Sequence, residues 1–234
     1  MTAADPAPPR TDRELLDTAA YGEVIARHGR LVFGVCRRVL RHDADAEDAF
    51  QATFITLFRK GGTFRHGDSV AGWLHTVAVR IALRARQRQA ARFLLERDAA
   101  MTADAPVSVP EPQWVADLDA ALAQLPAEVR LPLTLCYLQG KTGDEAAAEL
   151  GCSRSTLTRR LTEGRELLRK RMGAAVTAVA LLAILEGASA HEPPAAVVVA
   201  VTNQGASEAA VALANDLPAP VNHAFNRWLL VLLA

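Results

Sequence analysis

Arginine side chains offer the clearest chemistry in this sequence, and they gather in two stretches. Basic residues are concentrated in 80–97 and 154–171, whereas Arg227 is the only Lys or Arg after Gly173. Guanidinium groups clustered on one element bind phosphates, and such binding weakens as salt is added. The formal net charge is +0, so the local patches rather than the total charge indicate a polyanionic partner.

The cysteines do not suggest a metal site or a disulfide framework. Cys36, Cys136 and Cys152 lie far apart in sequence and are odd in number, and no pair has zinc spacing. We expect reduced, partly buried thiols and no metal or other cofactor.

The remaining reactive side chains form no catalytic pattern. There is no Ser-His-Asp arrangement, no phosphate-binding glycine loop and no paired-carboxylate spacing. The histidines that we expect to be loop or surface residues rather than catalysts are His28, His42, His66 and His75. The sequence therefore predicts a protein that is not an enzyme.

The chain carries no evident targeting signal. Its N-terminal stretch MTAADPAPPRTDRELL lacks the apolar core of a signal peptide, which predicts a cytoplasmic protein. The apolar run at 174–185 is shorter than the roughly 20 residues that span a bilayer. We do not expect stable membrane anchoring. Tethering through this run or through the apolar C-terminus is the alternative that cell fractionation would test.

Composition favours an all-α fold, because Ala, Leu, Val and Arg dominate and aromatic residues make up 5% of the chain. Apolar periodicity divides it into two small helical domains, 13–97 and 113–172. A flexible linker rich in Ala, Pro and Asp, 98–112, joins them. An Ala- and Val-rich extension follows at 173–234, in which we expect turns and a short strand at 191–210.

Acidic residues precede an apolar stripe in DADAEDAFQATFITLFRK. Phe50, Phe54, Leu57 and Phe58 have the spacing of one helix face, and the carboxylates before them suit the positive end of the helix dipole. On periodicity alone, this segment is an amphipathic helix with a solvated acidic start.

A second helix is predicted in SVAGWLHTVAVRIALRARQRQAAR. Asp68 or Ser69 can cap it, and Trp73, Leu74 and Ile81 belong to its buried stripe. Cations favour a helix C-terminus, but the arginines here exceed what a terminus needs. Those able to hold several phosphates are Arg80, Arg84, Arg86, Arg88 and Arg92.

The loop before that helix, KGGTFRHGDS, carries Phe64 beside Arg65. An aromatic ring next to a cation can stack on an unpaired base and clamp it. A plain connection between two helices is the alternative interpretation of this loop.

The second domain contains a short helix, a tight turn and a longer basic helix. Thr142 and Glu145 have capping-box spacing, so a helix is predicted from Gly143 to just before Gly151. Ser153 can cap the next helix, which buries a leucine stripe. The polar residues that project away from that stripe are Ser155, Thr158, Arg159 and Thr162. This order is typical of a helix-turn-helix, whose second helix enters the major groove, and a plain helical hairpin is the alternative.

Taken together, the two blocks resemble the extracytoplasmic-function type of bacterial RNA polymerase sigma factor. The motifs that carry the resemblance are DAEDAFQATF, GWLHTVAVRIALRAR, LPAEVRLPLTLCYLQGKTGDEAAAELG and STLTRRLTEGRELL. Their order and spacing across the linker cover roughly 20–172. The resemblance implies a promoter-specificity subunit whose partners are core RNA polymerase and promoter DNA. A helix-turn-helix regulator that needs no polymerase is the competing hypothesis.

The resemblance also implies roles for individual residues. Those expected to dock on polymerase are Asp45, Glu47, Asp48, Gln51 and Phe54. Those expected at the melted −10 element or its backbone are Phe64, Arg65, Ser69, Trp73, Arg80, Arg84, Arg86 and Arg88. Those expected at the −35 element are Arg154, Ser155, Thr156, Thr158, Arg159 and Arg160.

Some positions depart from the family pattern. Ala52 stands where members often have an acid, and Arg80 stands where many have Asn. Glu163 and Gly164 replace a frequent Arg-Ala pair, which removes a cation and is expected to loosen the helix. The extension 173–234 lies outside the match, where an anti-sigma factor or another regulator could act on it.

Overall fold

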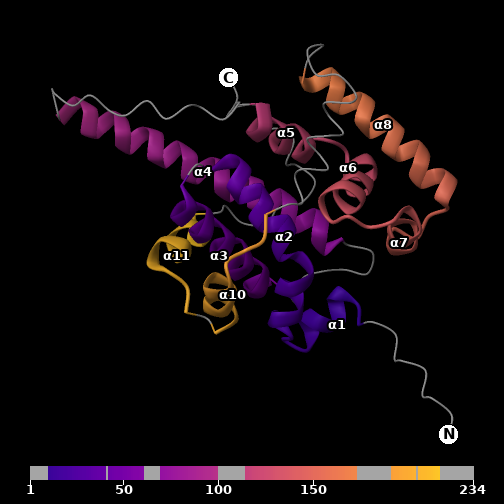
Figure 1. Cartoon of the computed structure of the whole chain (residues 1–234), viewed down its shortest axis with the longest axis horizontal. Coiled ribbons are helices and arrows are strands. Elements are labelled where there is room, and N and C mark those ends of the chain that lie inside the picture. The colour runs from indigo at the N-terminus through magenta and orange to yellow at the C-terminus, as the bar shows by residue number, and fades with distance from the viewer. Residues whose placement is uncertain are drawn as a thin grey trace, which may run out of the picture.

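Every regular element that the structure describes is a helix, as the composition predicted. The computed structural model describes residues 10–40, 42–60, 69–99, 114–172, 191–203 and 205–216, and no strand occurs among them. The elements are α1 (Asp12–Asp17), α2 (Tyr21–Val39), α3 (Asp43–Lys60), α4 (Val70–Ala99), α5 (Trp114–Ala123), α6 (Ala127–Leu133), the π-helical turn η2 (Thr134–Leu138), α7 (Gly143–Glu149), α8 (Arg154–Met172), α10 (Ala195–Thr202) and α11 (Glu208–Asn215). Figure 1 shows their arrangement.

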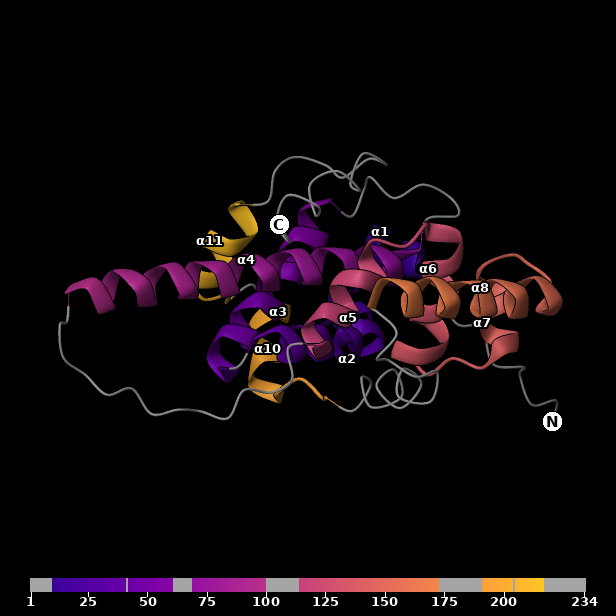
Figure 2. The ribbon, with the colours of Figure 1, turned by 90° about the horizontal axis from the view of Figure 1, so that it is seen from above.

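An N-terminal lobe forms where α2, α3 and α4 pack side by side, with α1 against α2. The predicted stripe of α3 lies inside it. Phe50 and Phe54 are fully buried with ring centroids 5.0 Å apart, and Phe33 of α2 meets Phe50 edge-on at 5.8 Å. Full burial of each such side chain contributes about 1.5–3 kcal/mol, so this stripe holds α3 against its neighbours. Seen from above, α4 runs on past the end of the bundle (Figure 2).

A C-terminal lobe consists of α5 to α8. Pro132 supplies no backbone N–H, and the helix that contains it widens into η2 directly afterwards. The chain then leaves the helix at Gly140, whose φ of 67° suits glycine. The predicted linker begins slightly later than expected, because α4 continues to Ala99; its remaining residues lie outside the described part of the chain.

A buried cluster of charges joins the two lobes. The Asp119 carboxylate of α5, 1% exposed, accepts hydrogen bonds from Arg38 of α2, at 2.7 Å from Nε and 2.9 Å from Nη2. His75 of α4 places Nε2 3.2 Å from the same carboxylate. Burial alone would raise the pKa of Asp119, but Arg38 and His75 hold it below its usual range. Since one acid serves helices of both lobes, it sets their relative position.

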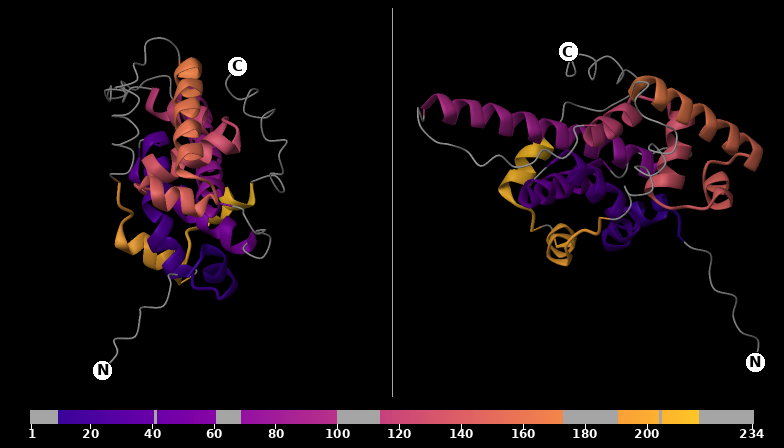
Figure 3. Two further views of the ribbon diagram at one scale, coloured as in Figure 1. Left: turned by 90° about the vertical axis from the view of Figure 1, so that its right-hand side faces the viewer. Right: turned by 45° about the horizontal axis from the view of Figure 1, so that its top comes forward.

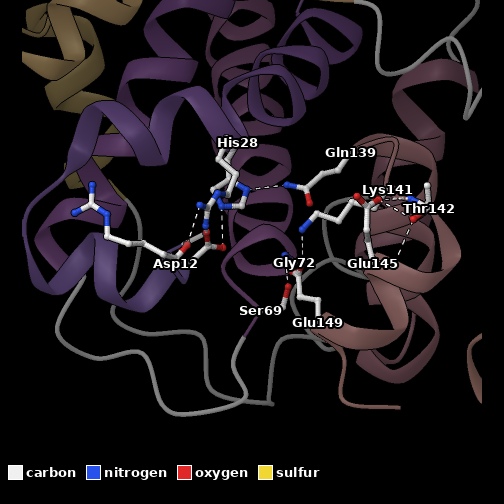
Figure 4. A network of polar contacts seen from close by, with 11 residues as sticks. Asp12, His28, Ser69, Gly72, Gln139, Lys141, Thr142, Glu145 and Glu149 are labelled. Carbon is white, nitrogen blue, oxygen red and sulfur yellow. Dashed lines mark hydrogen bonds and ion pairs between the residues drawn. The ribbon is translucent and has the colours of Figure 1, made fainter. Parts of the chain in front are cut away.

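A second polar contact between the lobes is centred on His28. Its Nε2 lies 2.9 Å from Asp12, and its Nδ1 lies 2.7 Å from the amide nitrogen of Gln139, at the end of η2 (Figure 4). The expectation that the histidines occupy loops or the surface is therefore wrong for His28 and His75, which are both fully buried. A carboxylate from another helix contacts Nε2 of each buried imidazole, Asp12 for His28 and Asp119 for His75.

The same interface contains a close fit between Gly72 and Leu131. A Cβ on Gly72 of α4 would lie 2.0 Å from Leu131 Cδ2 of α6. Glycine at this position lets the first turn of α4 accept the Leu131 side chain. The two lobes thus meet through shape as well as through charge.

Two helices of the C-terminal extension, α10 and α11, pack against the N-terminal lobe (Figures 1 and 3). The expectation of a short strand at 191–210 is wrong, because α10 and the start of α11 lie there, with a non-helical connection between them. The β-branched run Val197–Val199 favours a strand locally, but Val197 and Val201 bury one helical face against that lobe, and this packing overrides the local preference. Among the described residues, no helix is both long enough and apolar enough to cross a bilayer. The run at 174–185 lies outside them.

We predict that unfolding free energy falls as pH drops from 7 to 5, in part through His75. Burial lowers the pKa of His75, although the neighbouring Asp119 carboxylate acts to raise it. Between pH 7 and 5 the His75 side chain is therefore protonated in the unfolded chain but stays neutral in the folded one. Stability from this residue is complete above the ordinary pKa of about 6.5 and is lost below it, at up to about 1.4 kcal/mol per pH unit. Urea unfolding at several pH values measures the slope.

His75→Gln is the matched variant, because its amide can still donate to Asp119 but does not titrate. It should show a shallower slope over the same pH range. Equal slopes for both proteins would show that His75 is not the group that titrates.

Candidate nucleic-acid interface

The helices α7 and α8 are joined by a turn whose geometry is set by capping. The Thr142 hydroxyl accepts from the Glu145 backbone N–H, and the Glu145 carboxylate accepts from the Thr142 N–H at 2.8 Å, which confirms the predicted capping box. Gly151 follows with a φ of 59°. Ser153 then caps α8 by accepting from the Thr156 N–H at 3.2 Å. The predicted short helix, glycine turn and longer helix are all present.

The outer face of α8 carries the residues predicted for base contact. Ser155, Thr158 and Arg159 are exposed, as is Arg154, which pairs with Asp144 at the start of α7. Thr156 and Arg160 are half-buried. Thr158 donates its hydroxyl to the Arg154 carbonyl at 3.0 Å, so the hydroxyl oxygen stays available as an acceptor. This face can therefore offer both donors and acceptors to a groove.

The inner face of α8 packs on α6 through a glycine. Leu157 and Leu168 are fully buried, and Gly164 lies between them along the helix. A Cβ on Gly164 would lie 2.8 Å from Leu133 Cδ1 and 3.2 Å from the Val129 carbonyl oxygen. The expectation that Gly164 loosens this helix stays a prediction, and the structure adds a packing role that the sequence did not suggest. The missing side chain allows α8 to approach α6 closely.

The basic stripe of α4 consists of Arg80, Arg84, Arg86 and Arg88, and two of these arginines bind Asp216 of the C-terminal extension. Arg84 and Arg86 are half-buried and Arg88 is exposed. Burial, together with the neighbouring Arg84, lowers the pKa of Arg80 to about 10, so it remains a cation at neutral pH. Arg84 donates to the Asp216 carbonyl, and Arg88 pairs with the Asp216 carboxylate.

At the start of α4, two of the residues predicted for the −10 element are described. Ser69 caps the helix by accepting from the Gly72 N–H at 3.2 Å (Figure 4), and Trp73 is half-buried against the N-terminal core. Phe64 and Arg65 lie outside the described residues.

The acidic start of α3 faces α4 and the C-terminal extension. Gln89 donates to Asp45, while Ser207 donates its hydroxyl to Asp48 and its backbone N–H to Gln51 at 2.9 Å. Glu47 is half-buried. Phe54, predicted as part of a docking surface, is fully buried, so here it supports the surface from within.

Sequence reasoning did not anticipate two features of this site. The Arg38, Asp119 and His75 cluster joins residues far apart in the chain, and no local pattern signals it. The contacts from Ser207 and Asp216 come from a segment for which helices were not expected. The Ser207 cap of α11, which accepts from the Ala210 N–H at 3.0 Å, was the one local signal for that helix.

Family comparisons cover both lobes. The family model described as Sigma-70 region 2 matches residues 24–92, and the model described as Sigma-70, region 4 matches residues 116–168. The RNA polymerase sigma factor CarQ of Myxococcus xanthus is 33% identical over 157 residues, covering 66% of this chain and 90% of CarQ. The ECF RNA polymerase sigma factor SigE of Mycolicibacterium smegmatis is 31% identical over 157 residues, covering 64% of this chain and 60% of SigE.

Solved structures overlap with the chain only loosely. CnrH in complex with the cytosolic domain of CnrY is 26% identical with a TM-score of 0.35, covering 67% of this chain and 94% of CnrH. The sigma factor RpoE in complex with the anti-sigma factor NepR from Bartonella quintana is 21% identical with a TM-score of 0.29, covering 69% of this chain and 97% of RpoE. Overlaps this partial do not bear on how the lobes are arranged here.

We predict that Gly164→Ala destabilises the protein by about 1 kcal/mol. Alanine favours a helix interior by roughly 1 kcal/mol over glycine, but overpacking against the fixed Val129 carbonyl and Leu133 costs about 1–3 kcal/mol. Denaturant unfolding of the two proteins measures the difference.

Glu163→Ala is the control, because Glu163 is the exposed neighbour in the same helix and alanine there meets nothing. Its effect should stay within about 0.5 kcal/mol. A stabilised Gly164→Ala protein would contradict the close approach of α8 to α6.

Proposed function

Because this chain belongs to the extracytoplasmic-function family of RNA polymerase sigma factors, we propose that it binds core RNA polymerase and directs promoter recognition, local melting and transcription initiation. Its own residues carry out no bond-making step, and it acts where the polymerase works, in the cytoplasm. The domains that we assign are 13–97 for polymerase and the −10 element, 98–112 as linker, and 113–172 for the −35 element.

The observation that supports this proposal is the coexistence, on one chain, of two separate arginine-bearing helix faces, on α4 and α8, and a polar face at the start of α3. The exposed face of α8, with Ser155, Thr158 and Arg159, has the donors and acceptors that base edges require. The arginines of α4 supply a second, backbone-binding stripe. The polar start of α3, which includes Asp48 and Gln51, is then the surface for the polymerase.

A regulator that binds DNA without polymerase remains the second candidate, because the α7–α8 unit alone would suffice for it. The two functions differ in their need for core enzyme. Purified chain should be mixed with a genomic promoter library, with and without bacterial core polymerase. Sequence-selective binding and new transcripts are expected only with core. Equally selective binding without core, and no transcript with it, would favour the regulator.

We predict that Arg159→Ala weakens recognition of one −35 base pair by about 1–3 kcal/mol, or roughly 5- to 150-fold. The loss should be confined to promoters that carry the preferred base at that position, because a bidentate guanidinium contact distinguishes guanine. Competition between promoters randomised in the −35 element, transcribed by the reconstituted holoenzyme, measures it.

Arg169→Ala removes the same charge from an exposed position near the other end of α8. It should weaken binding to all the promoters alike, and only slightly, with a smaller dependence on salt. If both variants lost affinity uniformly, Arg159 would contact the DNA backbone rather than a base.

A further inference from the structure

The C-terminal helix pair, α10 and α11, is part of the same apolar core as the N-terminal lobe. Val197 and Val201 of α10 and Ala210 and Leu213 of α11 are buried together with residues of α2, α3 and α4. Leu213 is 9% exposed, whereas Val199, on the opposite side of α10, is 55% exposed. The pair therefore has one defined face, and that face is directed at α2 and α3.

The N-terminal end of α11 contacts two of the residues predicted to dock on polymerase. Ser207 donates its hydroxyl to Asp48 Oδ1 and its backbone N–H to Gln51 Oε1 at 2.9 Å, while its hydroxyl also caps α11. The Asp48 carboxylate thus lies at the positive end of the α11 dipole, which favours the contact. Asp48 Oδ1 and Gln51 Oε1 therefore accept hydrogen bonds from the extension and not from a partner.

The other end of α11 contacts the arginines predicted to follow promoter DNA. The Asp216 carboxylate pairs with Arg88, and the Asp216 carbonyl accepts from Arg84. Asn215 accepts from Arg59, at the end of α3, at 2.7 Å. A carboxylate that pairs with arginine uses the same donors that a phosphate would use.

We propose that the C-terminal helix pair is an in-chain inhibitor that competes with core polymerase and promoter DNA for the α3 and α4 surfaces. This inference rests on the proposed function, since it assumes that Asp48 and Gln51 lie in the polymerase contact. One helix, α11, covers both surfaces at once because its two ends reach α3 and α4 respectively.

The helix pair competes with partners in two ways: its side chains occupy the surface, and its polar atoms bind the arginines that DNA would bind. Leu213 and Ala210 occupy the apolar surface beside α3, so a partner helix cannot pack there until they leave. Asp216 neutralises Arg88 and engages Arg84, which reduces the local attraction for phosphate. Release of α11 frees both surfaces in one event.

The inhibition is partial, because its extent depends on the fraction of molecules in which the helix pair is bound to the N-terminal lobe. A tethered segment rebinds at a high effective concentration, so the closed form is favoured although the contact itself is small. The apparent affinity of the chain for polymerase is the affinity of the open form multiplied by its fraction. Substitutions that weaken the contact between the helix pair and the N-terminal lobe should therefore tighten polymerase binding. Most substitutions on a binding surface have the opposite effect.

The test measures the dissociation constant of full-length chain for bacterial core polymerase. Leu213→Asp places a charge in the buried face of α11 and should lower this constant at least about fivefold. Val199→Asp introduces the same charge on the exposed side of the helix pair and should leave it within about twofold. The double variant Ser207→Ala, Asp216→Ala removes polar contacts without burying a charge and should lower the constant about two- to fivefold.

The outcomes separate the two proposals. If every variant and the parent chain bind polymerase equally well, the inhibitor inference is wrong and the proposed function stands. If none binds, the proposed function is wrong and the inference falls with it.

Circular dichroism reports whether Leu213→Asp has folded. If it has not, the double variant decides, because its changes lie at exposed or half-exposed positions. A parent-like constant for the folded variants overturns the inference.

Discussion

A buried carboxylate is the charged centre of the contact between the two lobes of this protein. Asp119 has lost its water and depends on Arg38 and His75, which come from two helices of the other lobe. Such a cluster contributes little net stability compared with apolar packing, but breaking it inside the protein leaves an unpaired charge. In water the same groups are readily hydrated. The cluster therefore favours one arrangement of the lobes, in which Arg38, His75 and Asp119 satisfy one another.

The three candidate surfaces have different degrees of access in this arrangement. The outer face of α8 is exposed, with Arg159 and Thr158 directed away from the leucine stripe. The polar face of α3 and the basic stripe of α4 instead share α11 as a neighbour. The outer face of α8 is therefore exposed in the same arrangement in which α11 lies against α3 and α4.

Local rules predicted much of this structure because their causes are local. The Thr142–Glu145 capping box and the Phe50–Phe54 stripe both depend on residues within a turn or two of one another. The burial of His28 and His75 depends on carboxylates from other helices, and no periodicity announces such partners. Val197–Val199 favours a strand by local propensity, but packing against the apolar residues of α2 and α3 favours a helix and outweighs it. The packing role of Gly164 was not predicted for the same reason, because it depends on Val129 and Leu133 of another helix.

The fit of Leu131 over Gly72 bears on how the lobes are aligned. A side chain held in a notch one residue wide resists sliding along α4, because every neighbouring position carries a Cβ. The fit therefore sets the register of the C-terminal lobe along α4 to within one residue, which the charge cluster, made by long and flexible side chains, does not do by itself.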